Sequence, residues 1–219
     1  MIKIENTKIY GWEEAIRGMR NPKNSWDRMD SDYKYTCFND RKVCRGGDYR
    51  IGPNDHKLMM NLAAGGPVHA KYRRMIAVYV DITAPLYWWK EFDTYKVGTV
   101  ANSCSTMHKI HDKEFTLEDF SCEHLGERQM LMLKDCVMLE LNVARRNFID
   151  SKDKFFWWQM IQLLPSSYNQ KRTIMLNYEV LVGMYRDRKN HKLDEWVEFT
   201  KWITTLPYSE IITGEVKEG

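Results

Sequence analysis

The stretch that decides the fold runs Gly65-Gly66-Pro67-Val68-His69, then Met75-Ile76-Ala77-Val78-Tyr79-Val80, then Pro85-Leu86-Tyr87-Trp88-Trp89-Lys90-Glu91-Phe92. The middle segment is apolar, short and rich in β-branched residues, which is typical of a buried strand. The Gly-Gly-Pro turn ends a helix that the spacing of apolar residues predicts over 54–64. Pro85 suits the first turn of a helix that reaches Phe92. The sequence therefore predicts a helix, a turn, a central strand and a second helix in close succession.

Predictions for four further segments of the first half follow from their composition and periodicity. Ile2–Tyr10 alternates apolar and polar residues and is predicted to be a strand, and Glu13–Arg20 is predicted to be a short helix. Residues 22–52 are rich in Asn, Asp, Lys, Gly and Ser, so we expect a long loop or a series of small elements. Residues 97–106 are rich in Gly, Ser and Thr without an apolar period, which predicts an ordered loop.

The second half is predicted to be mainly helical. Helices are expected over 127–148, 153–164, 167–185 and 194–203, and Pro165 ends the second of them. Strands in the first half and helices in the second indicate an α+β fold with one core. Because no stretch has the composition of a linker, we expect a single domain over residues 1–219.

The composition excludes several classes of protein. Of the 219 residues, 43% are hydrophobic and 29% are charged, which excludes long disorder and fibrous repeats. The 33 basic and 30 acidic residues are too balanced to indicate binding to nucleic acid. No segment approaches the roughly 20 apolar residues that cross a bilayer, and the N-terminus has no apolar signal-peptide segment. The five cysteines are odd in number and irregularly spaced, which predicts free thiols and a cytoplasmic location.

Isolated residues offer little catalytic chemistry. His108 and His111 lie three apart and are followed by Cys122 and His124, but no paired-ligand spacing completes a zinc motif. We therefore predict no metal site. Cys104 lies in a small polar loop, where it is either a reactive thiol or part of a hydrogen-bonded turn.

Two basic segments are candidates for anion binding. Residues 45–50, Arg-Gly-Gly-Asp-Tyr-Arg, could direct backbone N–H groups and two guanidinium groups at a phosphate. A second cluster ends a predicted helix and contains Arg186, Arg188, Lys189 and His191. Cations at that position either match the helix dipole or clamp a phosphorylated ligand, and the sequence leaves both open.

Two pairs of adjacent tryptophans, Trp88-Trp89 and Trp157-Trp158, each lie in a predicted helix. Neighbouring residues on a helix point about 100° apart. One ring of each pair is therefore expected in the core, and the other is expected to face a different neighbour.

Three segments together resemble the flavin-dependent thymidylate synthase family, ThyX. Residues 65–69, with the strand and helix that follow, are similar to the family's G-H-x-S-x-x-E-H turn. Residues 94–105 lie where the family has R-H-R-x-x-S-x-N-E-x-S-x-R. Residues 164–168, Asn177 and residues 188–196 are similar to its L-P-x-x-x-Y, N-x-R-x-L and R-x-x-x-H-x-x-W-E helical tail.

The resemblance implies an α/β fold with a central twisted sheet flanked by helices, and a homotetramer with FAD lying across subunits. It fades over an insertion-like segment, 21–52, and a divergent helical segment, 107–150. The implied reaction forms dTMP from dUMP, with carbon from methylenetetrahydrofolate and hydride from NADPH through the flavin. The implied cofactor-binding residues are His69, Tyr95, Lys96, Asn177 and His191. The implied substrate-binding residues are Asn102, Ser105 and Arg188.

Several cationic positions of the family pattern are changed in this chain. The R-H-R triplet reads Thr94-Tyr95-Lys96, and the position two after Asn177 is Glu179 rather than Arg. Each lost arginine removes charge-assisted hydrogen bonds worth ~1.5–3 kcal/mol. Nearby cations that could replace them are Lys71, Arg73, Arg74, Lys90 and Lys96.

These departures lead to three hypotheses. The favoured one is a flavin-dependent enzyme that acts on a different nucleotide or pyrimidine through a rebuilt site, and it includes an enzyme that keeps the family's methylation of dUMP. The second is a non-catalytic protein of the same fold that binds a nucleotide-like ligand between subunits. The third is an interaction protein whose tryptophan pairs and divergent segments form partner surfaces.

Overall fold

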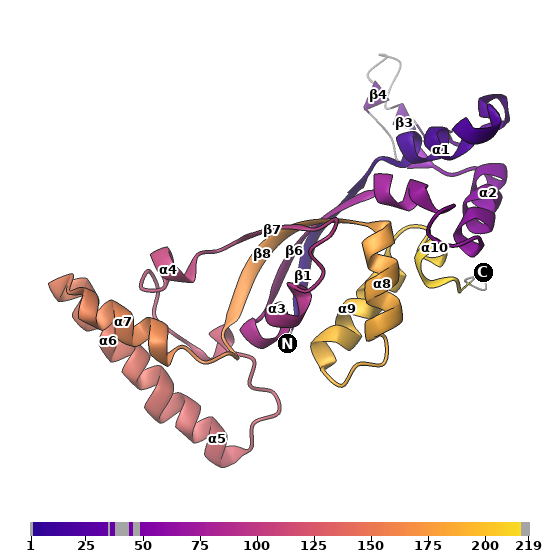
Figure 1. The fold of residues 1–219 in the computed structure, drawn as a ribbon. Helices are drawn as coiled ribbons and strands as arrows, with labels where there is room; N and C mark the ends of the chain where they lie inside the picture. The colour runs from indigo at the N-terminus through magenta and orange to yellow at the C-terminus, as the bar shows by residue number, and fades with distance from the viewer. Residues whose placement is uncertain (1, 35, 38–43, 46–48, 216–219) are drawn as a thin grey trace.

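The computed structural model describes residues 2–34, 36–37, 44–45 and 49–215. Its centre is a four-stranded antiparallel sheet (Figure 1). In spatial order the strands are β1 (Lys3–Tyr10), β6 (Ala77–Pro85), β8 (Asn169–Asn177) and β7 (Val100–Ser103). The mixed architecture agrees with the predicted α/β class, with a central sheet and flanking helices.

Strand β6 forms the middle of the sheet and of the hydrophobic core. It pairs with β1 along one edge and with β8 along the other. Val78, Val80 and Ile82 on one face of β6 are at most 1% exposed. This is the strand predicted from residues 75–80, and its alternating burial follows from the two-residue period of a strand.

Three helices cover the buried face of the sheet: α3 (Leu86–Phe92), α8 (Tyr178–Arg188) and α9 (Asp194–Thr205). The Trp88 ring lies 4.8 Å from the ring of Trp196 on α9. Trp89 faces the other way and donates its indole N–H to the carbonyl of Gln170 on β8, at 2.9 Å. Both rings are fully buried. The two rings of this pair therefore face different neighbours, as predicted, and both lie in the core.

The second tryptophan pair follows the prediction. Trp157 is half-buried and donates its indole N–H to the carbonyl of Met107 at 3.1 Å. Trp158, its neighbour, is 44% exposed.

One end of the molecule is built from small elements around two helices. Helix α1 (Trp12–Arg20) is followed by the short turns η1 (Asn21–Lys23) and η2 (Trp26–Arg28). Two short strand pairs follow, β2 (Asp32–Tyr33) with β5 (Tyr49–Arg50) and β3 (Thr36–Cys37) with β4 (Cys44–Arg45). Helix α2 (Pro53–Ala64), η3 (Lys71–Met75) and α10 (Glu210–Thr213) complete this end. Of the two expectations for residues 22–52, the series of small elements is therefore the correct one.

The opposite end is a helical projection with its own hydrophobic cluster (Figure 1). Its elements are α4 (Thr106–Lys109), η4 (Leu117–Asp119), α5 (Glu127–Leu131), the π-helical η5 (Met132–Met138), α6 (Leu139–Ser151) and α7 (Lys154–Leu163). The run from α5 to α6 and helix α7 confirm the helices predicted over 127–148 and 153–164. The cluster consists of Ile110, Phe115, Phe120, Leu133, Leu141, Ala144 and Met160. A single domain over 1–219 stays a prediction.

Two local predictions were wrong. Residues 167–185 were expected to form one helix, but residues 169–177 form β8 and the helix begins only at Tyr178. Residues 97–106 were expected to form a loop, but residues 100–103 form β7 and pair with β8. In both cases the pairing of distant strands outweighs weak local preferences. Strands are consequently not confined to the first half of the chain.

A buried ion pair joins α1 to α2. The guanidinium group of Arg20 contacts Asp55 Oδ1 through Nε and Nη2, each at 2.6 Å. The other oxygen, Oδ2, accepts hydrogen bonds from the N–H groups of Asp30 and Ser31, each at 3.0 Å, and from the Ser31 hydroxyl at 2.6 Å. Asp55 is fully buried. One carboxylate thus holds α1, α2 and the segment between them in fixed positions.

Asp30 in turn binds the first turn of α2. Its carboxylate accepts hydrogen bonds from the N–H groups of Asn54 at 2.8 Å and Asp55 at 3.0 Å. Burial acts to raise the pKa of Asp30, but these N–H groups outweigh it and hold that pKa below its ordinary value of 3.8. Because the pKa of Asp30 is lowered by folding, its carboxylate stabilises the folded state at pH values above its ordinary pKa. This contribution is lost as the pH falls through the lowered pKa.

We predict that Asp55→Asn lowers the free energy of unfolding by about 3–5 kcal/mol, because it leaves the buried guanidinium group of Arg20 without a countercharge. Urea unfolding at pH 7 measures the change. Asp27→Asn, at a nearby exposed carboxylate, is the matched control and should change the free energy by less than about 0.5 kcal/mol. Equal unfolding midpoints for both variants would contradict the assigned role.

Candidate functional site

The residues implied as functional lie in three places. Tyr95, Arg188 and His191 gather beside the C-terminal end of α3. His69 lines a separate cleft beside α2. Asn102 lies on β7 and Ser105 just beyond it. One chain therefore brings Tyr95, Arg188 and His191 together, with Lys96 next to Tyr95, and leaves His69, Asn177, Asn102 and Ser105 outside this group.

The residues beside α3 form a group that we call the Glu91 cluster: Glu91, Tyr95, Arg188, His191 and Trp196. Glu91 Oε2 is its centre. It accepts hydrogen bonds from Arg188 Nη1 at 2.7 Å and from the Trp196 indole N–H at 3.0 Å. It also lies 3.5 Å from His191 Nε2. A carboxylate that sequence reasoning did not select therefore organises the cluster.

Arg188 is held in one orientation by several contacts. Its Nε donates to the Tyr95 hydroxyl at 3.0 Å, and its guanidinium carbon lies 4.7 Å from the centre of the Trp196 ring. Nε and Nη1 of Arg188 are thus engaged. Its third nitrogen, Nη2, has no hydrogen-bond partner among the described residues. The side chain is 19% exposed, so that nitrogen is the part of Arg188 that can meet a ligand.

Asn177 has a structural task at the start of α8. Its Oδ1 accepts a hydrogen bond from the Val180 N–H at 3.0 Å, which caps the helix. Its Nδ2 lies against Gly98, where a Cβ would approach to 3.0 Å and where φ is +80°. Glycine is required at position 98 for both reasons. The loop that carries Lys96, which is exposed, is therefore folded onto the start of α8.

Asn102 lies on the uncovered face of the sheet. It is paired with Thr173, and residues directly opposite each other on antiparallel strands share a face. The Thr173 hydroxyl donates to Asp81 Oδ1 at 2.7 Å, and Lys171 Nζ lies 3.3 Å from Asp81 Oδ2. These polar partners, with the Thr173 hydroxyl making the largest contribution, lower the pKa of Asp81. Asn102 is therefore beside a charged network rather than in the Glu91 cluster.

Ser105 caps a short helix. Its hydroxyl oxygen accepts a hydrogen bond from the His108 N–H at 3.1 Å at the start of α4. Cys104 next to it is exposed, and its N–H donates to the carbonyl of Lys171 at 2.9 Å. This backbone contact extends the pairing of β7 with β8, so residue 104 belongs to an ordered turn with an accessible thiol.

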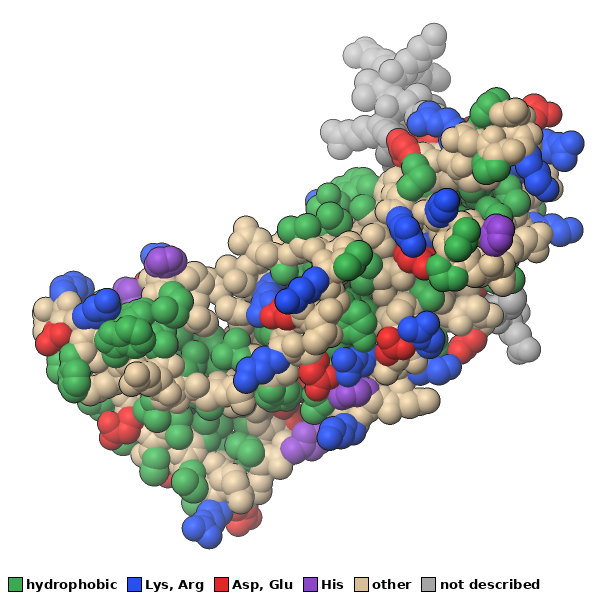
Figure 2. Space-filling model, in the orientation of Figure 1, with side chains coloured by type: hydrophobic (Ala, Val, Ile, Leu, Met, Phe, Trp, Pro, Cys, Tyr) green, Lys and Arg blue, Asp and Glu red, His purple; other side chains and the backbone are tan. Residues whose placement is uncertain are grey.

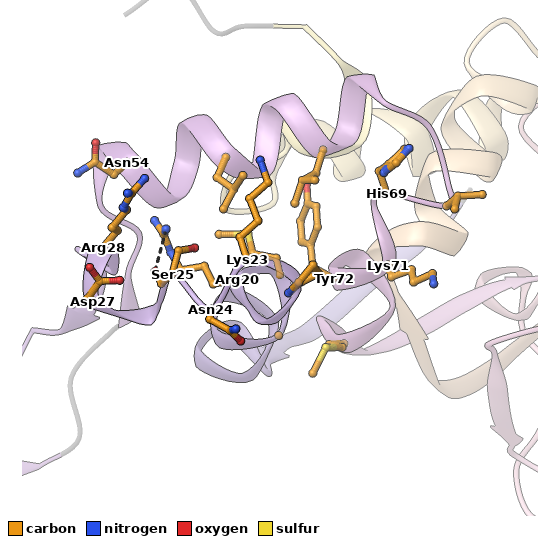
Figure 3. Close-up of a pocket in the computed structure, with 17 residues that line it drawn as sticks. Arg20, Lys23, Asn24, Ser25, Asp27, Arg28, Asn54, His69, Lys71 and Tyr72 are labelled. Carbon is orange, nitrogen blue, oxygen red and sulfur yellow. Dashed lines mark hydrogen bonds between the residues drawn. The ribbon is translucent and has the colours of Figure 1, made fainter.

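His69 lies in a large cleft, which we call the His69 cleft (Figure 3). Its volume is about 1120 Å³. The end of α1 and residues 22–28 form one wall, and α2 and residues 68–75 form the other. Tyr72 is buried in the second wall and donates its hydroxyl to the carbonyl of Met59 at 2.8 Å. Burial raises the pKa of Tyr72 to about 12, so this part of the wall is uncharged at neutral pH.

Arg172 is a cation that sequence reasoning missed. Its guanidinium carbon lies 4.2 Å from the centre of the Trp89 ring, and its Nη1 contacts Asp93 Oδ1 at 2.7 Å. Asp93 immediately precedes the Thr94-Tyr95-Lys96 triplet. A guanidinium group from β8 thus stands beside the motif segment that lacks its arginines. Because residues 167–185 were wrongly predicted to form a helix, the sequence did not indicate that Arg172 lies beside this triplet.

Glu179 stands where the family pattern after Asn177 has an arginine, and its negative charge is balanced by a cation on η3. Its Oε2 lies 3.6 Å from Nη1 of Arg73 on η3. The two side chains are 18% and 8% exposed. Among the described residues, Arg73 Nε and Glu179 Oε2 have no hydrogen-bond partner although both atoms are buried. The pair borders a hollow of about 530 Å³ between α2, α8 and α10, whose lining it leaves close to neutral.

Other sequence candidates add nothing to a site. In the part of the chain that the structure describes, no group of three or more His, Cys, Asp or Glu side chains could hold a metal ion. The centre of the predicted anion-binding segment 45–50, residues 46–48, lies outside the described residues. No helix among the described residues is both long and apolar enough to cross a bilayer.

The structure is similar to solved thymidylate synthases of the flavin-dependent class. One is thymidylate synthase X from Helicobacter pylori with FAD and dUMP, at 13% identity and a TM-score of 0.64 over 98% of both chains. A second structure described as flavin-dependent ThyX from the same organism, complexed with FAD and dUMP, has 14% identity and a TM-score of 0.66 over 98% of this chain and 100% of that chain.

A third similar structure is described as a methylase. The UMP/dUMP methylase PolB from Streptomyces cacaoi, bound with 5-Br dUMP, has 11% identity and a TM-score of 0.60 over 98% of this chain and 94% of that chain. By sequence, no family model and no curated protein matches the chain. The chain therefore has the ThyX fold, in agreement with the resemblance stated for its motifs.

We predict that Glu179→Ala destabilises the protein by about 2 kcal/mol, because Arg73 is then left buried without a countercharge, and partial exposure of the pair reduces the effect below that of a fully buried one. Thermal and urea unfolding measure it. Asp187→Ala, which breaks the exposed Arg186–Asp187 pair, is the control and should change stability by less than about 0.5 kcal/mol. A Glu179 variant as stable as that control would show that Arg73 does not need its partner.

Proposed function

We propose that this protein binds a flavin and a pyrimidine nucleotide and acts as a flavin-dependent enzyme on that nucleotide. The observation that carries the proposal is the similarity of fold over 98% of the chain to proteins whose structures hold FAD with dUMP or a dUMP analogue. The changed triplet Thr94-Tyr95-Lys96 argues against an unaltered dUMP methylation. NADPH and methylenetetrahydrofolate belong to the proposal only if that family reaction is kept.

The Glu91 cluster supports this proposal through its side chains. It combines aromatic faces, an imidazole and a fixed guanidinium group from segments about a hundred residues apart in sequence. We assign Tyr95, Lys96 and His191, with His69 and Asn177, to the flavin. We assign Arg188, Asn102 and Ser105 to the nucleotide. Bound FAD would supply the hydride chemistry, and these residues would orient the two ligands and exclude water.

The cations around α3 fit an anionic ligand although the motif arginines are absent. Arg172 and Arg188 each use two nitrogen atoms on protein partners and hold their guanidinium groups against aromatic rings. Stacked guanidinium groups are preorganised and lose little conformational freedom when they bind a phosphate. They therefore place two fixed guanidinium groups near the changed triplet, each already paired with a carboxylate of the chain.

The residues assigned to the flavin and the nucleotide do not all lie together within one chain. This favours a site that other copies of the chain complete. We propose a homotetramer in the cytoplasm, as the family resemblance implies. Hydrophobic side chains are exposed on the helical projection and gather there in Figure 2. They include Leu131, Met132, Leu139, Phe155, Trp158 and Leu163, which are 42–61% exposed. An apolar surface of this extent is typical of a subunit interface.

A specific observation favours a second candidate function. Asn177 is engaged as a helix cap and Glu179 as an ion-pair partner, so one implied flavin position and one changed motif position have structural tasks here. A non-catalytic protein that binds a nucleotide-like ligand, or a protein partner, in the same inter-subunit pocket is the alternative.

The first test is the visible absorption spectrum of the protein after incubation with FAD and removal of unbound flavin. We expect retained oxidised-flavin bands that shift when dUMP is added. His191→Ala should weaken FAD binding by about tenfold because it removes a polar contact. His124→Ala, at an exposed histidine paired with Asp194, is the matched control and should bind normally.

The remaining outcomes separate the two candidates. A colourless protein whose melting temperature rises with dUMP would favour the non-catalytic alternative, because a ligand that binds only the folded state stabilises it. A colourless protein with no response to dUMP would overturn the flavin-dependent enzyme and the binding of dUMP by the non-catalytic alternative.

The assembly is tested by light scattering coupled to gel filtration. We expect four chains for the wild type. The variant Phe155→Glu/Trp158→Glu should form smaller species, because each substitution places a charge on the exposed apolar surface. Lys152→Glu, between α6 and α7, is the control and should leave the assembly intact. A monomeric wild type would contradict the proposed homotetramer.

A further inference from the structure

A second cleft, which we call the aromatic cleft, lies where β1 ends and α1 begins. Its volume is about 770 Å³, which is within the usual range of sites for small molecules. It shares no lining residue with the His69 cleft, and it contains none of the residues that we assign to the flavin or the pyrimidine nucleotide. Five rings and one guanidinium group dominate its lining: Tyr10, Trp12, Tyr33, Tyr49, Arg50 and Tyr208.

Four of these rings are packed in two edge-to-face pairs. The centres of the Tyr33 and Tyr49 rings, on β2 and β5, lie 4.9 Å apart with their planes at 72°. The centres of the Trp12 and Tyr208 rings lie 5.4 Å apart with their planes at 69°. In such a pair, the ring that presents its edge keeps both of its faces clear of its partner. A further flat group can therefore stack on these rings, and Tyr10, which is 55% exposed, adds a fifth.

The Tyr208 ring is held in place before any ligand binds. Its hydroxyl oxygen accepts a hydrogen bond from the Ile51 N–H at 2.9 Å. The carbonyl of the preceding residue, Pro207, accepts a hydrogen bond from the Tyr178 hydroxyl at 2.7 Å. The φ angle of Tyr208 is +53°, a left-handed conformation that a bulky residue adopts only where its surroundings impose it. A ring fixed in this way loses little conformational entropy when a ligand stacks on it.

Arg50 is the one charged side chain among the described residues that line the aromatic cleft. It is exposed, and it forms no ion pair within the part of the chain that the structure describes. Burial is the main cause that raises the pKa of Tyr49 to about 12, so the neighbouring hydroxyl is uncharged at neutral pH. The cleft therefore combines aromatic faces with a single positive charge that has no countercharge of its own.

The aromatic cleft also explains part of a sequence pattern that the proposed function does not use. Tyr49 and Arg50 are the last two residues of segment 45–50, for which the sequence predicts anion binding. Together with Tyr33 they belong to residues 21–52, where the resemblance to ThyX fades. Aromatic side chains on which a base stacks, beside an arginine that pairs with a phosphate, are a common means of binding nucleotides. One free cation matches one phosphate group.

We propose that the aromatic cleft binds a purine nucleoside monophosphate, with the base stacked among the rings and the phosphate on Arg50. The two fused rings of a purine offer more stacking surface than the single ring of a pyrimidine. Five aromatic side chains around a volume of about 770 Å³ therefore favour the larger base. This second nucleotide site is separate from the proposed site for the flavin and the pyrimidine nucleotide, and it does not depend on that proposal.

The test uses AMP, adenosine and inorganic phosphate as probes in calorimetric titrations of the wild type, Arg50→Ala and Tyr10→Leu. We expect AMP to bind the wild type more tightly than adenosine does, and phosphate alone to show no binding at the same concentrations. Arg50→Ala should weaken AMP binding by about tenfold and leave adenosine binding unchanged, because the lost cation pairs only with the phosphate. Tyr10→Leu should weaken both AMP and adenosine by about tenfold, because a stacking ring is lost.

Two matched controls are Arg17→Ala on α1 and Tyr79→Leu on β6. Both positions are exposed and neither lines the aromatic cleft. The centre of the Tyr79 ring lies 6.0 Å from that of Tyr10, and leucine keeps an apolar contact there. Both controls should bind AMP like the wild type. All four substitutions are at exposed positions, and melting curves verify that each variant is folded.

A parallel titration with FAD separates this inference from the proposed function. If AMP does not bind the wild type, the inference is overturned whatever FAD does. If AMP binds but neither cleft variant weakens it, the inference is also overturned, and displacement of AMP by FAD would then place AMP in the flavin site. If AMP binding depends on Arg50 and Tyr10 while FAD does not bind, the inference stands and the flavin proposal fails.

Discussion

The ion pair between Arg20 and Asp55 is the interaction on which one end of the molecule depends. A fully buried carboxylate cannot remain charged at low cost unless all its lone pairs are used. Here the guanidinium group uses one oxygen, and two backbone N–H groups and a hydroxyl use the other. The requirement for these partners places α1, the turns that follow it and α2 around one point. The position of the His69 cleft follows directly, since its two walls meet at this pair.

Much of the fold could be predicted because its strongest signals are local. The apolar residues of β6 and the uninterrupted helical pattern of residues 127–148 each determine their element without distant help. Strand β8 could not be predicted in the same way. The face of β8 that the helices do not cover carries Lys171, Thr173 and Met175. The alternation of buried and exposed residues is therefore clear only once the pairing with the neighbouring strands is known. Tertiary pairing decided this element, and the sequence window around it did not contain that information.

The candidate site divides in a similar way. Family motifs led to Tyr95, Arg188 and His191, and these do lie together. The same motifs could not lead to Glu91 or Arg172, because neither residue stands at a family position. Compensation between Glu179 and Arg73 was also hidden, since the two residues are far apart in sequence and only the packing of η3 against α8 joins them. Motifs therefore led to three residues of the Glu91 cluster, while the electrostatics of the cluster depend on residues outside them.

The position of Glu91 has a consequence for how any anion can enter. The Glu91 carboxylate contacts the Arg188 guanidinium group with normal hydrogen-bond geometry, at 2.7 Å from Nη1. Under the proposed nucleotide binding, a phosphate that reaches Arg188 would meet a cation whose charge Glu91 already balances, with Nη2 as the nitrogen left for it. An internal countercharge of this kind would weaken the binding of small anions by charge alone. It would make the rest of the ligand, rather than its charge, the feature that decides what is retained.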